Sequence, residues 1–159
     1  MRVTLIKRGI RDKLIAELPS QLLLADSIAA DGITTPMPAE VVTTDRTELN
    51  GLPSLMVLVT TSSPVPNTSS QTYRHRCVVG ITVGADDEDN VTALIERYVW
   101  ATRRVLRTNY LPAKHLAGPI DTGEESYSPL LQQPDTIEFP FVKGAYIEVF
   151  VTSYEDDDA

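Results

Sequence analysis

The alternation of side chains in TYRHRCVVGITVG, residues 72–84, limits the fold more than any other feature of this sequence. One face of the extended chain would carry His75, Cys77, Val79 and Ile81, while the other would carry mostly polar or small side chains. A period of two over this length is typical of a strand with one buried face. The segment therefore predicts a long, half-buried strand.

The segment that follows predicts a helix over residues 87–107. Six apolar side chains and Thr102 fall on one stripe at helical spacing: Val91, Leu94, Ile95, Tyr98, Thr102, Val105 and Leu106. The acidic run DDED precedes the stripe, and we expect Asp86 or Asp87 to be the N-cap, accepting a hydrogen bond from a free backbone N–H. Acidic residues at this end and arginines at the other both complement the helix dipole.

The remaining segments complete an α+β pattern. Residues 9–31 predict helical structure that Pro19 divides in two, because proline suits a first helical position and not an interior one. Strands are expected in AEVVTT, SLMVLVTT, IDTGEESYSPL and GAYIEVFVTSY. We therefore predict one domain over residues 1–159, with a mostly antiparallel sheet, an N-terminal helix and one long amphipathic helix packed on the sheet.

Two polar segments are expected to lie outside the sheet. Residues 60–72, TTSSPVPNTSSQT, predict a flexible polar loop, because they are rich in Ser, Thr and Pro and lack apolar spacing. This loop is a candidate docking arm, with Pro64, Val65, Pro66 and Asn67 as its contact residues. Residues 155–159, EDDDA, predict an acidic tail.

The net charge of −8 argues against tight binding to nucleic acid, since an acidic surface repels phosphate backbones. Five of the 14 lysines and arginines lie in the first 13 positions, where they are either solvated or paired with the acidic end of a neighbouring copy. One cysteine excludes an internal disulfide. No apolar run approaches the roughly 20 residues that span a bilayer, so we expect no membrane association. We expect the chain to fold in a cytoplasm.

The residues that could perform chemistry do not form a recognisable motif. A calcium loop that began at Asp86 would need glycine and glutamate where Val91 and Arg97 stand. The two histidines, His75 and His115, lie in different elements, and with Cys77 they are too few for a zinc site. We therefore expect neither catalysis nor a metal or cofactor.

The only tryptophan, Trp100, lies on the charged side of the predicted helix, nearly opposite the apolar stripe. Either it packs under another part of the chain, such as residues 108–142, or it contacts another subunit, where aromatic and arginine residues are enriched. The second alternative defines a candidate subunit interface with the neighbouring charged residues Glu96, Arg103, Arg104 and Arg107.

Residues 73–106, YRHRCVVGITVGADDEDNVTALIERYVWATRRVL, together with ESYSPLL and AYIEVFVTSYE, resemble the tail terminator (tail completion) proteins of long-tailed bacteriophages. The resemblance lies in a basic, aromatic strand, an acidic turn, and a helix that ends in leucine near arginine. It implies a small α+β protein that forms a homo-hexameric ring, caps the tail tube, and offers a surface to neck or head-completion proteins. DNA would pass through this ring without specific binding.

The resemblance implies a virion protein of the tail or neck that resides in the host cytoplasm during assembly. Two alternatives stay open. One is another phage neck or head-completion adaptor, which would use residues 60–72 to dock on a portal or tail protein. The other is a small intracellular ligand-binding domain or enzyme.

Overall fold

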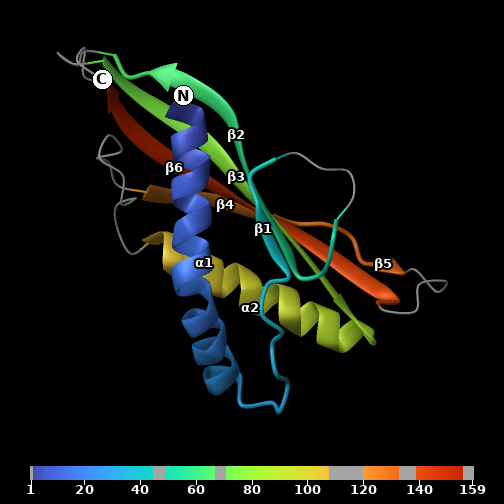
Figure 1. Cartoon of the computed structure of the whole chain (residues 1–159). Helices are drawn as coiled ribbons and strands as arrows, with labels where there is room; N and C mark the ends of the chain where they lie inside the picture. The colour runs from blue at the N-terminus through green and yellow to red at the C-terminus, as the bar shows by residue number, and fades with distance from the viewer. Residues whose placement is uncertain (1, 45–48, 67–70, 108–119, 133–138, 156–159) are drawn as a thin grey trace.

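The computed structural model describes residues 2–44, 49–66, 71–107, 120–132 and 139–155 (Figure 1). The elements in chain order are α1 (Arg2–Ala29), β1 (Glu40–Val42), β2 (Ser54–Pro64), β3 (Gln71–Ala85), α2 (Glu88–Arg107), β4 (Ile120–Tyr127), β5 (Leu131–Gln132) and β6 (Phe141–Glu155). The predicted α+β class is confirmed, with an N-terminal helix and a second helix packed on a mostly antiparallel sheet.

The described strands form one sheet in the order β1-β2-β3-β6-β4, and β5 pairs with the start of β6. Only the short pair of β1 and β2 is parallel. β3 pairs with β6 along its whole length, from Gln71 opposite Glu155 to Ala85 opposite Phe141. The predicted alternation in β3 is confirmed, because the odd-numbered residues from His75 to Val83 are buried and face the helices.

Both helices cover the same face of the sheet and cross each other on it (Figure 1). α1 contributes a stripe with a spacing of four residues, and every member is fully buried: Ile6, Ile10, Leu14, Leu18 and Leu22. The predicted stripe of α2 is also buried throughout. Burying each such side chain stabilises the fold by about 1.5–3 kcal/mol, so this two-layer core carries most of the stability.

The break predicted at Pro19 is wrong, since α1 runs without interruption from Arg2 to Ala29 with Pro19 inside it. An internal proline removes one backbone hydrogen bond and costs about 3 kcal/mol. The buried stripe extends past Pro19 from Leu14 and Leu18 to Leu22, and the burial of these side chains outweighs that cost.

The loop predicted for residues 60–72 is also largely wrong. β2 continues to Pro64 and β3 begins at Gln71, so two strands of a hairpin occupy most of that segment. The Val65 N–H donates to the Thr72 carbonyl at 2.8 Å, which continues the ladder beyond the end of β2. Polar residues form strands here because threonine is β-branched and suits extended backbone, and because this end of β2 is exposed to solvent. Residues 67–70 lie outside the described part.

Candidate interaction surfaces

A groove between the C-terminal half of α1 and the outer side of α2 contains Trp100. Its volume is about 310 Å³, and it is lined by Ala25, Ile28, Ala29, Asp31, Ala93, Glu96, Arg97 and Trp100. The Trp100 ring is half-buried and also packs against the core. Its described neighbours in the groove come from α1, from Asp31 just after α1, and from α2 itself. Residues 108–119 and 133–138 of the segment suggested from the sequence lie outside the described part.

The four charged residues of the candidate subunit interface differ in what they contact and in how exposed they are. The Arg104 guanidinium lies over the Trp100 ring, 4.9 Å from its centroid, and its Nε donates to Gln21 Oε1 of α1 at 2.9 Å. Arg103 Nη1 donates to the Gly123 carbonyl of β4 at 3.1 Å. Glu96 and Arg107 are exposed. Two of the arginines therefore link α2 to its neighbours in the same chain, and intramolecular contacts hold Arg104 over the Trp100 ring.

Arg97 is a buried arginine of α2 that joins neighbouring parts of the fold. The helical pattern in the sequence did not single it out. It is only 7% exposed. Its Nη1 donates to Asp26 Oδ1 at 2.8 Å and to the Ile33 carbonyl at 2.9 Å, and its Nη2 donates to Asp31 Oδ2. A buried arginine needs paired charges because an isolated charge is costly to remove from water. This cluster forms the wall of the groove beside Trp100 and holds the end of α1 against α2.

The two carboxylates of the cluster are held in their charged form. Burial alone would raise the pKa of Asp26, but hydrogen bonds from Thr35 and Arg97 outweigh this effect, and the pKa lies below its ordinary value. The hydrogen bond from Arg97 is the main cause that lowers the pKa of Asp31. Next to the cluster, the Tyr98 hydroxyl donates to the Pro36 carbonyl at 2.6 Å, and burial raises its pKa. The chain after α1 is thus fixed by polar contacts to α2.

The face of the sheet opposite the helices forms the second surface. It carries half-buried Met56 and Val78 beside exposed Tyr146, and a second cavity of about 260 Å³ lies there, lined in part by Met56, Leu131 and Tyr146. Charged groups interrupt the apolar area, with the Arg76 Nε 2.6 Å from Glu148 Oε2 and the Arg74 guanidinium over the Phe150 ring. A sheet face of this mixed composition suits contact with another protein.

His75 is a buried part of the sheet, held between two serine hydroxyls. Its Nδ1 lies 2.7 Å from Ser62 Oγ of β2, and its Nε2 lies 2.7 Å from Ser153 Oγ of β6. A neutral imidazole has one donor and one acceptor nitrogen, and a hydroxyl can serve either. The arrangement satisfies both ring nitrogens and joins three strands, which is a structural role. The second histidine, His115, lies outside the described residues.

Cys77 is fully buried, and burial raises the pKa of its thiol to about 12. The thiol therefore stays protonated near neutral pH, where only a thiolate would act as a nucleophile. Within the part of the chain that the structure describes, no three His, Cys, Asp or Glu side chains are grouped so that they could hold a metal ion.

The acidic run before α2 acts as a helix start. Asp87 Oδ1 accepts from the Asn90 N–H at 2.8 Å, and the Asp87 carbonyl accepts the first helical bond from Val91. Asp87 is therefore the N-cap, which confirms one of the two predicted residues, and Asp86 is exposed beside it.

The candidate docking residues lie at the end of the β2–β3 hairpin. Pro64 is the last residue of β2, half-buried Val65 follows it, and Pro66 is exposed. Asn67 lies outside the described residues. In the acidic tail, Glu155 ends β6 and residues 156–159 lie outside the described part.

Neither described helix could cross a membrane, because neither combines enough length with enough apolar character. Comparison with models of known protein families gives no match, and comparison with curated protein sequences gives none either.

Proposed function

We propose that this chain is a structural virion protein of the phage tail terminator type, whose copies form a ring that caps the tail tube and joins it to the neck or head. The observation that carries the proposal is the amount of apolar surface without a partner among the described residues. Tyr146 and Leu131 are 55% and 54% exposed beside the open sheet face, and Ile28 is 66% exposed at the rim of the groove. Exposed apolar side chains that gather beside a groove or an uncovered sheet face, as these do, favour contacts with other proteins.

The burial and bonding of the side chains that could act as catalysts or ligands support a structural role. His75 bridges strands, Cys77 is a buried thiol, and Arg97 pairs with the carboxylates of Asp26 and Asp31. A catalytic group, by contrast, must reach a substrate and have a pKa near the working pH. The tail tube protein and the neck or head-completion proteins are the expected partners. The net charge of −8 would keep DNA from adhering while it passes through the ring.

Native mass spectrometry at high protein concentration tests the proposal and should detect hexamers, and images of assembled tails should show six-fold rings. Trp100→Ala should weaken ring assembly at least tenfold, and it should weaken the fold by less than it weakens the ring. Leu23→Ala is the matched control, because Leu23 is 59% exposed on α1 and does not line the groove. A chain that stays monomeric both in solution and on tails would overturn the proposal, and unchanged assembly of Trp100→Ala would remove that residue from the interface.

The exposed end of the β2–β3 hairpin favours a second candidate, a neck or head-completion adaptor that docks by this arm. Residues 60–64 are all exposed, although they belong to β2. Replacement of residues 66–71 by Asn-Gly places a two-residue hairpin turn between Val65 and Thr72, whose backbones already pair, and so keeps the strand register. An adaptor should then lose binding to its purified portal or tail tube partner and keep its unfolding temperature. Unchanged binding would exclude the hairpin as the docking arm.

The groove at Trp100 favours a third candidate function, that of a small ligand-binding domain. Its volume of about 310 Å³ is at the lower end of the range of about 300–1,000 Å³ for ligand pockets. A thermal-shift screen with calcium, magnesium and nucleotides separates this candidate from the other two. We expect no shift, and stabilisation by several degrees would favour ligand binding over a purely structural role.

A further inference from the structure

One edge of the sheet is open along most of β2. β1 pairs with β2 only at Ser54–Met56, while β3 pairs with the other side of β2 over its whole length. No strand in the described part of the chain pairs with the outer side of Val57–Pro64 (Figure 1). Such an edge carries unpaired N–H and C=O groups, which can accept a strand from another chain.

The opposite edge of the sheet is β4, and its length and direction match the open part of β2. β4 has eight residues, as many as Val57–Pro64, and of the described strands only β6 pairs with it. β2, β3, β6 and β4 are successively antiparallel, so β2 and β4 run in opposite directions. If a second copy continues the sheet in the same orientation, its β4 therefore meets β2 in the antiparallel arrangement, which forms the stronger ladder.

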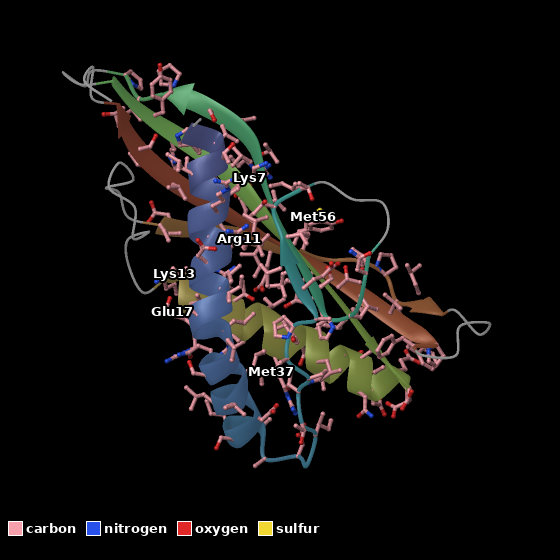
Figure 2. All side chains as sticks on the ribbon, in the orientation of Figure 1. Lys7, Arg11, Lys13, Glu17, Met37 and Met56 are labelled. Carbon is pink, nitrogen blue, oxygen red and sulfur yellow. The ribbon has the colours of Figure 1, made fainter. Side chains whose placement is uncertain are left out.

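The charges beside the two edges are opposite in sign. Lys7 and Arg11 lie on the side of α1 nearest β2, whereas Lys13 and Glu17 lie on the other side (Figure 2). Arg11 binds only its neighbour Asp12 among the described residues, and no described group pairs with Lys7. On β4 the exposed side chains include Asp121, Glu124 and Glu125. Complementary charges of this kind select a partner and fix its orientation.

We propose that the chain assembles head to tail, with the open edge of β2 and the basic side of α1 in one copy against the acidic β4 edge of the next. This inference rests on the proposed ring, for which it supplies the contact between subunits. A contact between two different surfaces of the same chain repeats from copy to copy and closes into a ring when the rotation permits.

Two features of β2 restrict which strands can pair with this edge. The strand pairing shifts between Val59 and Thr61, and Pro64 lacks an N–H at the end of the strand. Bulges and prolines are common means by which edge strands avoid indiscriminate pairing. The charges of α1 and β4 therefore contribute to partner choice along with the backbone edge.

A charge-swap experiment tests the proposed contact. One variant carries Lys7→Glu and Arg11→Glu, so that both edges become acidic, and the other carries Asp121→Lys, Glu124→Lys and Glu125→Lys, so that both become basic. Each variant alone should assemble at least tenfold more weakly than the unmodified chain, because identical charges meet at every contact. An equimolar mixture should recover assembly with the two variants alternating, since every contact then joins opposite charges.

Controls separate the contact from effects on the fold and from the proposed function. Asp86→Lys makes the same charge change as Glu124→Lys at an exposed carboxylate before α2, and it should leave assembly unchanged. Recovery in the mixture also shows that both variants fold. Backbone amides of Val57–Pro64 and of β4 should gain protection from hydrogen exchange in the assembled state.

The outcomes that overturn the inference differ from those that overturn the proposed function. Rings that form equally well from either variant alone, or edges that gain no protection, would refute this contact and leave the ring intact. A mixture that stays unassembled although both variants are folded would also refute it. An unmodified chain that forms no ring at all would instead refute the proposed function.

Discussion

Arg97 of α2 donates a hydrogen bond of 2.8 Å to Asp26 of α1, although the two residues are 71 positions apart in the chain. Asp26 also accepts from the backbone N–H of Thr35 at 2.9 Å, so the pair fixes both the end of α1 and the chain that leaves it. These contacts position the wall of the groove that contains Trp100. The geometry of this candidate surface therefore depends on a buried ion pair.

Replacement of Arg97 by methionine should destabilise the protein by about 3 kcal/mol, because it leaves Asp26 in a partly buried site without its charged partner. Denaturant unfolding followed by circular dichroism measures the change. Arg107→Met is the matched control on the same helix, and its effect should stay within about 0.5 kcal/mol because Arg107 is exposed. A similar, small effect for both variants would show that the ion pair contributes little.

The stability of the fold should decrease in acid partly through Asp26. Its pKa in the folded chain lies below the ordinary value of 3.8, so its contribution is present above that pH and is lost as the pH falls through the folded pKa. Asp26→Asn should therefore be less stable than the unmodified chain at pH 7, and the difference should shrink below about pH 4. Thermal unfolding between about pH 2 and 7, a range that includes the ordinary carboxyl titration, measures this difference in stability. A difference that does not change with pH would contradict this assignment.

The two serines beside His75 should differ in their effect on stability, although each lies 2.7 Å from a ring nitrogen. Ser153 is fully buried, so Ser153→Ala removes a hydrogen bond that water cannot easily replace, at a cost of about 1–2 kcal/mol. Ser62 is exposed, so water can replace its hydroxyl, and Ser62→Ala should cost less than about 0.5 kcal/mol. Equal losses in chemical denaturation would refute the distinction.

Cys77 should resist alkylation while the protein is folded. Its thiol is buried and has a pKa of about 12, so at pH 8 almost no reactive thiolate is present. Mass spectrometry after iodoacetamide treatment should find an unmodified native chain and one label per chain in denaturant. Ser63→Cys provides the control, because this exposed position on β2 should be labelled in the folded state. Rapid native labelling at Cys77 would show that the core opens there.

The sequence by itself determined the elements whose patterns are local. The period of two in β3 and β6 and the helical stripe of α2 predicted their types and buried faces, because a side chain's direction follows directly from backbone geometry. Asp87 was also predictable, since an N-cap bonds to an N–H three residues away. Local propensity failed at Pro19 and in residues 60–64, where contacts with the rest of the fold outweigh it.

Only the tertiary structure decided how the surfaces are assembled. The helical pattern of α2 did not single out Arg97, whose burial depends on its pairing with Asp26 at the end of α1 and with Asp31 just after it. The groove at Trp100 and the opposite charges of the β2 and β4 edges likewise need a strand order that no local pattern specifies. Contacts between residues far apart in the chain form only when the whole core packs, so their partners cannot be read from spacing alone.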